Sequence, residues 1–128
     1  MTRSGVTYTP HETTEFENLV KWYFTEKYPD HIPWEGAVAA AIYAFYQIPK
    51  SWTKKKKEEA AQGLIFPMSK PDGDNIAKAV LDSLNGIAYR DDAHITDMHV
   101  MKRYSETPGT YVILMTDFVG DEDVQKSD

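Results

Sequence analysis

The sequence contains no cysteine among its 128 residues. It can therefore form neither a disulfide framework nor a zinc site with thiolate ligands. It also lacks an apolar run long enough to cross a bilayer. The first residues, MTRSGVTYTPHE, lack the apolar segment of a signal peptide. We therefore expect a cytoplasmic protein without membrane contact, and a chain of this length predicts one domain with its own core.

Positive charge is also scarce, with 14 Lys and Arg against 20 Asp and Glu and a formal net charge of −6. Taken alone, this balance argues against nucleic acid as a partner, because phosphate binding requires a basic surface. The distribution of charged residues along the sequence weakens that argument. Residues 120–128 (GDEDVQKSD) hold four acidic residues and one lysine, which is −3 of the −6. We expect a folded domain over residues 1–119 and an acidic, disordered tail over residues 120–128.

Apolar periodicity and turn residues divide the domain into helices and strands. The pattern predicts an α+β fold in one small domain, a mixed sheet of about four strands with two or three helices. The alanine-rich strand is expected to be buried on both faces, and the last strand to form a hairpin with the strand before it, after the turn SETPG. Predicted helices cover residues 9–28, 50–63 and 74–85; predicted strands cover residues 37–47, 95–104 and 111–116, with a brief extended piece at 87–89.

Acidic residues gather at two places, the stretch KPDGDN at residues 70–75 and the pair Asp91 and Asp92. In an extended segment, Asp72 and Asp74 would point to the same side. Alternatively, Asp74 caps the following helix, with Asn75 at its first position. Asp92 can join them only if the chain folds back after that helix.

Carboxylates that meet at one point repel each other unless a cation binds. Oxygen-rich sites of this kind suit Mg²⁺ or Mn²⁺, and they leave coordination positions for water and phosphate oxygens. That is the requirement for metal-assisted phosphodiester hydrolysis. Simpler interpretations remain open for each residue: a turn, a solvated pair or a helix cap. A calcium loop starting at Asp72 is excluded, because its fifth and twelfth positions would be Ile76 and Ser83.

Five lysines lie in the short helical segment 50–57 beside Trp52. They fit a solvated helix face and a phosphate-contacting patch about equally well. The residues that would contact DNA are Lys50, Lys54, Lys55, Lys56, Lys57 and Arg103.

Lys102 shares one side of its predicted strand with Met98, Val100 and Tyr104. An unpaired charge there is costly, so a carboxylate site within reach would explain it. Asp82 is expected to pair with Lys78 at i,i+4 spacing.

Residues 70–102, KPDGDNIAKAVLDSLNGIAYRDDAHITDMHVMK, closely resemble the RusA family of Holliday junction resolvases. The shared elements are an acidic D-x-D-N, a lysine one helical turn later, a D-x-L-N-G helix end, a D-D pair and a lysine on the following strand. The resemblance extends more weakly over most of the chain.

The resemblance implies a Mg²⁺-dependent endonuclease, with Mn²⁺ as a substitute, that cuts four-way DNA junctions as a homodimer in recombination and repair. Carried over by position, Asp72, Asp74 and Asp92 would be the catalytic carboxylates and metal ligands, and Lys78 the essential lysine. We expect three further residues to hold these side chains in position without contacting the metal: Asn75, Asp91 and Lys102.

Two other functions compete with this interpretation. One is a module that binds branched DNA without cutting it, which loss of an aspartate or of Lys78 would have favoured; all are present. The other is a small-molecule phosphohydrolase, against which the lysine cluster argues, since a small substrate needs no extended positive surface.

Overall fold

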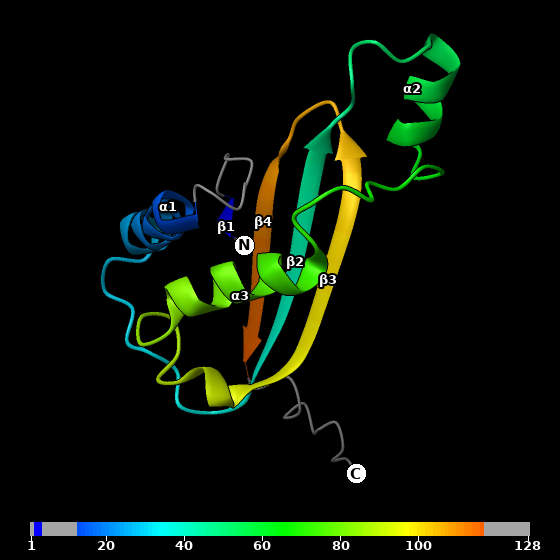
Figure 1. Ribbon diagram of the computed structural model, residues 1–128. Coiled ribbons are helices and arrows are strands. Elements are labelled where there is room, and N and C mark those ends of the chain that lie inside the picture. Colours follow the sequence, from blue (N-terminus) through cyan, green and yellow to red (C-terminus); the bar gives the residue numbers. More distant parts are fainter. Residues whose placement is uncertain (1, 4–12, 117–128) are drawn as a thin grey trace.

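The structure is a computed structural model that describes residues 2–3 and 13–116. The capping box predicted at residues 9–12 and the predicted tail at residues 120–128 lie outside these ranges. The elements in chain order are β1 (Thr2–Arg3), α1 (Thr13–Lys27), β2 (Val38–Gln47), α2 (Lys54–Ala61), α3 (Gly73–Leu84), the 3₁₀ helix η2 (Asp92–His94), β3 (Ile95–Ser105) and β4 (Gly109–Thr116). This small mixed α+β domain confirms the predicted fold class (Figure 1).

None of the helices in the described ranges combines the length and apolar character needed to cross a bilayer.

The four strands form one sheet in the order β1-β4-β2-β3. β2 pairs in parallel with β3, from Val38 opposite Ile95 to Gln47 opposite Ser105. On its other side β2 pairs antiparallel with β4. The predicted hairpin between β3 and β4 is therefore wrong, because β4 returns beside β2. The alanine-rich β2 tolerates the central position, whereas the polar β3, with Asp97 and His99 exposed, suits an edge.

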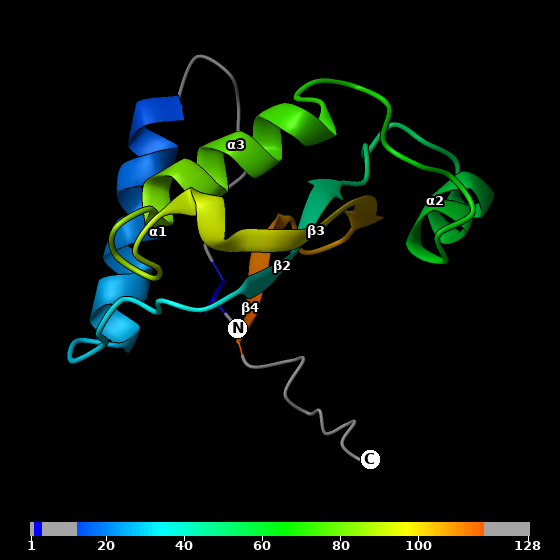
Figure 2. The same cartoon turned by 90° about the horizontal axis from the view of Figure 1, so that it is seen from below.

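The two longer helices, α1 and α3, lie on the same face of the sheet (Figure 2). The apolar spacing predicted for α1 is confirmed, since Phe16, Val20 and Phe24 are all buried. They pack with the buried face of α3 and with alternate residues of the sheet into one core. The sheet contributes Val38, Ala40, Ile42, Ala44 and Val112 to that core.

The opposite face of the sheet carries a row of aromatic rings from β2 and β4. Tyr43 stacks on Phe45 with ring centroids 6.1 Å apart, and Phe45 meets Tyr111 edge-on at 5.4 Å. These side chains are half-buried rather than buried. The prediction that β2 is buried on both faces therefore holds fully only for the face under the helices.

The short helix α2 stands apart from the two-layer body (Figures 1 and 2). The Thr53 side chain caps it by accepting from the Lys56 amide, and Gly63 follows its end with φ of 80°. Both features match the predicted boundaries. A ring contact between Trp52, just before α2, and Tyr104, with centroids 5.2 Å apart, joins its base to the end of β3.

Candidate active site

The exposed side of α3 carries the polar residues of the site. Seven of its 12 residues are buried against α1 and the sheet. Asp74, Lys78 and Asp82 are exposed and follow one another at intervals of four residues, so they form one stripe along the helix. The Lys78 ammonium lies 3.2 Å from the Asp82 carboxylate, as the sequence predicted. The burial of the other side of α3 fixes the direction in which this stripe faces.

The helix begins two residues earlier than either sequence-based alternative required. Asp72 is extended, with φ of −79° and ψ of 169°, and its Oδ1 accepts a hydrogen bond of 3.0 Å from the Asn75 amide. Asp72 is therefore the N-cap, and Asp74 lies in the first turn. A carboxylate is favourable at both places, because the first turn of a helix carries partial positive charge.

Two side chains from the sheet hold the segment that leads into α3. Lys102 Nζ donates to the Ser69 carbonyl oxygen at 2.7 Å, and the Tyr46 hydroxyl donates to the Pro71 carbonyl oxygen at 2.9 Å. Burial, followed by the nearby Asp72 charge, raises the pKa of Tyr46 to about 12, which keeps this hydroxyl protonated as a donor. Lys102 thus contacts a backbone carbonyl next to the acidic cluster, and the predicted contact with a carboxylate is replaced by this one.

A tight return after α3 brings the second acidic pair back to the helix. Gly86 has φ of 80°, and its amide donates to the Tyr89 carbonyl oxygen at 2.8 Å. Tyr89 is fully buried, and its hydroxyl donates to the Leu81 carbonyl oxygen. Burial raises the pKa of Tyr89, and the charges of Asp92 and Asp82 raise it further. The return therefore fixes η2, with Asp92 at its start, beside the middle of α3.

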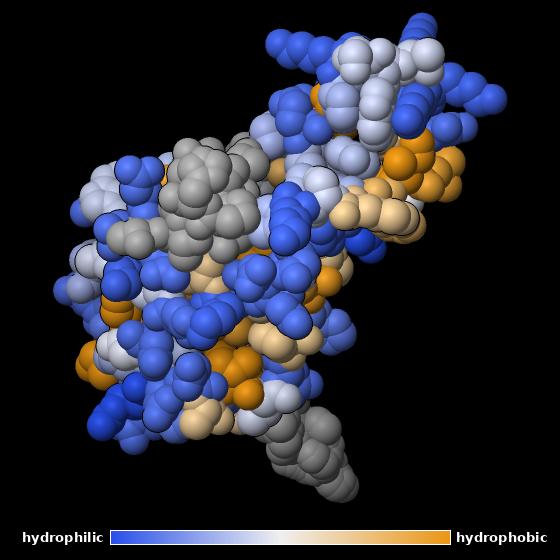
Figure 3. All heavy atoms as spheres, viewed as in Figure 1, coloured by the Kyte–Doolittle hydropathy of each residue, from blue (hydrophilic) through white to orange (hydrophobic). Residues whose placement is uncertain are grey.

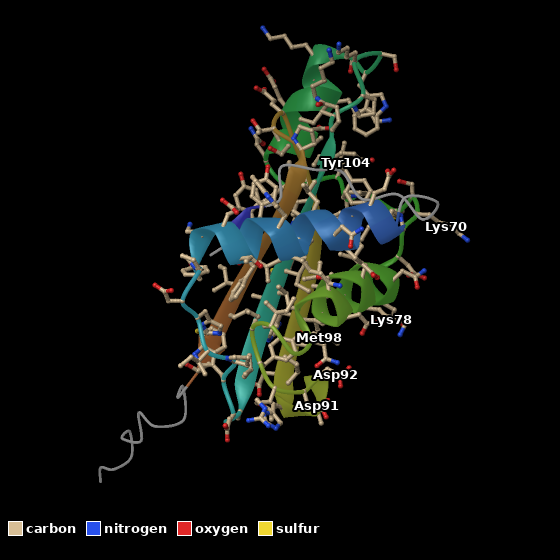
Figure 4. The ribbon with its side chains drawn as sticks, turned by 90° about the vertical axis from the view of Figure 1, so that its left-hand side faces the viewer. Lys70, Lys78, Asp91, Asp92, Met98 and Tyr104 are labelled. Carbon is tan, nitrogen blue, oxygen red and sulfur yellow. The ribbon has the colours of Figure 1, made fainter. Side chains whose placement is uncertain are left out.

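The exposed stripe of α3 and the start of η2 face one open hollow of about 510 Å³. In Figure 4, Lys78, Asp92 and Asp91 follow one another down one side of the molecule. The floor of the hollow is apolar and comes from α3 and β3. Its lining residues are Asp74, Ala77, Lys78, Leu81, Asp82, Asp92, Ile95, Thr96 and Met98. Three predicted site residues, Asp74, Lys78 and Asp92, are thus brought together, whereas Asp72 lies outside this lining.

Hydrogen bonds, with smaller effects of neighbouring charges, shift the pKa values of Asp91 and Asp92 in opposite directions. The Asp91 side chain accepts from the Ala93 amide at 3.1 Å, and this bond lowers the pKa of Asp91. The pKa of Asp92 is raised, chiefly by its hydrogen bond with Asp91 and further by the charges of Asp91 and Asp82. The Lys78 ammonium acts in the opposite direction. Repulsion at Asp92 is the kind that a bound cation relieves.

The donor atoms around the hollow fit a hard divalent cation. They are carboxylate oxygens, with one threonine hydroxyl, and no imidazole or thiolate lies among them. Within residues 2–3 and 13–116, no three carboxylate, imidazole or thiolate side chains lie close enough to hold a metal ion by themselves. A cation held by fewer protein oxygens, with water and phosphate completing its shell, corresponds to the way Mg²⁺ usually binds.

The residues predicted to contact DNA lie away from the hollow. Lys50 and Lys54–Lys56 are exposed, and Lys57 is half-buried. Lys56 Nζ lies 4.1 Å from the centre of the Trp52 ring. The Arg103 guanidinium lies 4.9 Å from the Phe66 ring and also donates to the Lys102 carbonyl oxygen at 2.9 Å. The lysines are therefore accessible on α2, whereas Arg103 is engaged within the chain.

Sequence reasoning missed two groups of residues at the site. The apolar floor, which includes Leu81, Ile95 and Met98, was not identified, because periodicity cannot show where a core meets solvent. Tyr46 lies on the same side of β2 as Val38 and Ile42, and nothing in its position indicated the hydrogen bond to residue 71.

Comparison with known proteins identifies the family of this chain. A 107-residue stretch is 37% identical to the uncharacterized protein YqaN of Bacillus subtilis (strain 168), and it covers 82% of this chain and 75% of that protein. The family model described as endodeoxyribonuclease RusA matches residues 1–115, which include every element from β1 to β3 and nearly all of β4. The chain therefore belongs to the RusA family of endodeoxyribonucleases.

Proposed function

We propose that this protein is a Mg²⁺-dependent endonuclease that resolves four-way DNA junctions by paired symmetric nicks, acting as a homodimer in DNA recombination and repair in the cytoplasm. The observation that carries the proposal is the meeting of Asp74 and Lys78, on α3, with Asp92, from η2, at one hollow. Family membership supplies the endodeoxyribonuclease class.

In the proposed reaction, a water molecule attacks a phosphodiester and one strand is cut. A bound Mg²⁺ supplies charge neutralisation at the phosphate and a more acidic water. Asp74 and Asp92 would hold the cation at the hollow. Asp72 lies outside the lining and would join them through its other carboxylate oxygen only after the start of α3 shifts on metal binding. Lys78, whose side chain is 75% exposed, is free enough to turn from Asp82 toward a phosphate and stabilise the developing charge.

The lysines of α2 support DNA as the substrate. α2 packs at Tyr104, near the end of β3, while Asp92 precedes its start. Nine residue steps from Ile95 to Tyr104 span about 30 Å. That length matches roughly nine base pairs of a duplex arm. One arm of a junction could therefore contact the lysines while its end nearest the crossover lies in the hollow.

The aromatic face of the sheet supports the homodimer. Tyr43 and Phe45 are only half-buried although they lie near the centre of the sheet, and Met115 on the same face is 51% exposed. A second copy covering this face would remove apolar surface from water, and a two-fold contact would pair two sites with two strands. Analytical ultracentrifugation with Phe45→Ser tests this: we expect the parent to sediment as a dimer and the variant as a monomer.

The decisive experiment is cleavage of a synthetic four-way junction in Mg²⁺, compared with a linear duplex of the same sequence. We expect paired nicks in the junction from the parent and none from Asp74→Asn, with junction binding retained by both. Asp30→Asn is the matched control, because Asp30 is exposed in the loop between α1 and β2. EDTA should abolish cutting, and Mn²⁺ should restore it.

Each contrary result selects another interpretation. Junction binding without cutting in either metal would favour a DNA-binding module. Equal cutting by the parent and Asp74→Asn would remove the assigned site.

A further inference from the structure

An exposed apolar ridge lies on the segment that connects the lysine helix α2 to the N-terminus of α3. Exposure alternates along residues 64–68, and the three large residues at alternate positions are the exposed ones. Leu64 is 66% exposed, Phe66 46% and Met68 88%. Figure 3 shows apolar side chains gathered beside the hydrophilic surface of α2. Exposed apolar residues in contiguous patches usually mark an interaction surface.

The ridge is held in place from both sides of β3. Phe66 packs 4.9 Å from the Arg103 guanidinium, whereas Ser69, three residues later, accepts from Lys102. Arg103 and Lys102 are consecutive on a strand, so they point to opposite faces of the sheet. The segment therefore wraps the edge of β3, and Pro67 between the exposed residues is buried. A ridge anchored in this way presents its side chains without a large cost in ordering them.

The charges around the ridge decide what it can bind. Lys54, Lys55 and Lys56 are exposed on one side of it, and Lys70 is exposed on the other. A second copy docked here by a two-fold axis would bring each lysine helix toward its equivalent, and like charges would oppose the contact. A nucleic acid presents both phosphates and apolar base faces, so it complements the ridge and its rim together.

We propose that Leu64, Phe66 and Met68 form a wedge that inserts against the unstacked bases at the branch point of a DNA junction, while the lysines of α2 hold the adjoining arm. Apolar side chains, Phe, Leu and Met among them, open base steps in this way in proteins that distort DNA. The wedge ends four residues before Asp72, so bases opened there lie next to the strand offered to the site. The inference rests on the proposed function and assigns its selectivity for branched DNA to this segment.

The experiment uses four-way junctions with 2-aminopurine, whose fluorescence rises on unstacking, placed either at the branch point or in the middle of an arm. Binding is measured in EDTA, so that metal-dependent cutting does not interfere. The variant is Leu64→Gln/Met68→Gln, chosen because both side chains are mostly exposed. The control is Ile32→Gln, which changes an aliphatic residue that is 81% exposed in the loop between α1 and β2.

The parent and the control should raise the branch-point signal strongly and leave the arm signal unchanged. The ridge variant should lose most of that rise, while the salt dependence of its binding stays the same because the lysines remain. In Mg²⁺ it should cut a fully paired junction about tenfold more slowly. A junction with mismatched bases at the branch point should restore its rate.

Three outcomes would overturn the wedge. They are an equal branch-point signal from the ridge variant, an equal loss in the control, and a ridge variant that changes oligomeric state, which would identify the ridge as a protein interface. If the parent cuts junctions without unstacking their bases, the wedge fails and the proposed function stands. If it unstacks them without cutting, the wedge stands and the nuclease function fails. Absence of junction binding overturns both.

Discussion

Asp72 has two roles that can be separated by substitution. Its Oδ1 caps α3 through the Asn75 amide, and the resemblance to the RusA family implies that its carboxylate also binds metal. Asp72→Asn keeps a capping oxygen but removes the charge, because asparagine and aspartate are about equally good N-caps. Asp72→Ala removes both. Comparison of the two variants therefore isolates the helix cap from the chemistry.

The expected magnitudes follow from the position of Asp72. Loss of a carboxylate charge at a helix N-terminus costs about 0.5 kcal/mol. Loss of the cap itself costs about 1 kcal/mol more. The melting temperature of Asp72→Asn should thus be slightly lower than that of the parent. The melting temperature of Asp72→Ala should be lower than that of Asp72→Asn by about 4 °C for a domain of this size. Cleavage should be lost in both variants, since both lack the carboxylate.

Thermal unfolding followed by circular dichroism gives the first quantity, and junction cleavage well below the melting temperature gives the second. Junction cutting by Asp72→Asn at the parent's rate would show that Asp72 only caps the helix. Equal melting temperatures for Asp72→Asn and Asp72→Ala would instead contradict the stabilising role of Asp72 as the N-cap of α3.

Other substitutions test the remaining contacts of the site. Tyr46→Phe should lower the free energy of unfolding by about 1 kcal/mol through loss of one hydrogen bond. In the parent, the raised pKa of Tyr46 contributes stability below the phenol's usual pKa of 10.0, and that contribution should disappear as pH rises toward 12. The free energy of unfolding in urea should therefore fall more steeply over this pH range in the parent than in Tyr46→Phe. Lys78→Met should abolish cleavage yet shift stability by less than about 0.5 kcal/mol, because its ion pair with Asp82 is exposed. Asp92 must lose its proton to bind a cation and its pKa is raised, so cleavage should fall on acidification; in a pH–rate profile of Asp91→Asn that fall should move to lower pH.

The helices were predictable because capping residues and apolar spacing act locally in the chain. The capping threonine and Gly63 set the bounds of α2, and apolar spacing located α1 and α3. The pairing of β4 was not predictable in the same way. The turn at SETPG is compatible with a hairpin or with a return beside β2, and the choice depends on which strand can accept neighbours on both edges. Which strand occupies the centre depends on the assembled sheet and cannot be read from the turn sequence alone.

The site was predictable in its residue types and less so in its arrangement. Asp74, Lys78 and Asp82 share a stripe because helical spacing fixes them. The meeting of this stripe with Asp92 needed the return at Gly86, which the motif Asn85-Gly86 indicated only as a helix end. The separation of Asp72 from the hollow follows from capping geometry. A shift of two residues in the start of α3, from the predicted cap at Asp74 to the observed cap at Asp72, decides it.

The parallel pairing of β2 with β3 has a consequence for how the protein folds. Both helices that follow β2, and both acidic segments of the site, lie within the connection between these two strands. No adjacent pair of segments can close this part of the sheet early, so contacts of long sequence separation must form before the site exists. Proteins with such contacts fold comparatively slowly. During synthesis, the parallel pair and the hollow lined by β3 can therefore form only after β3 has left the ribosome.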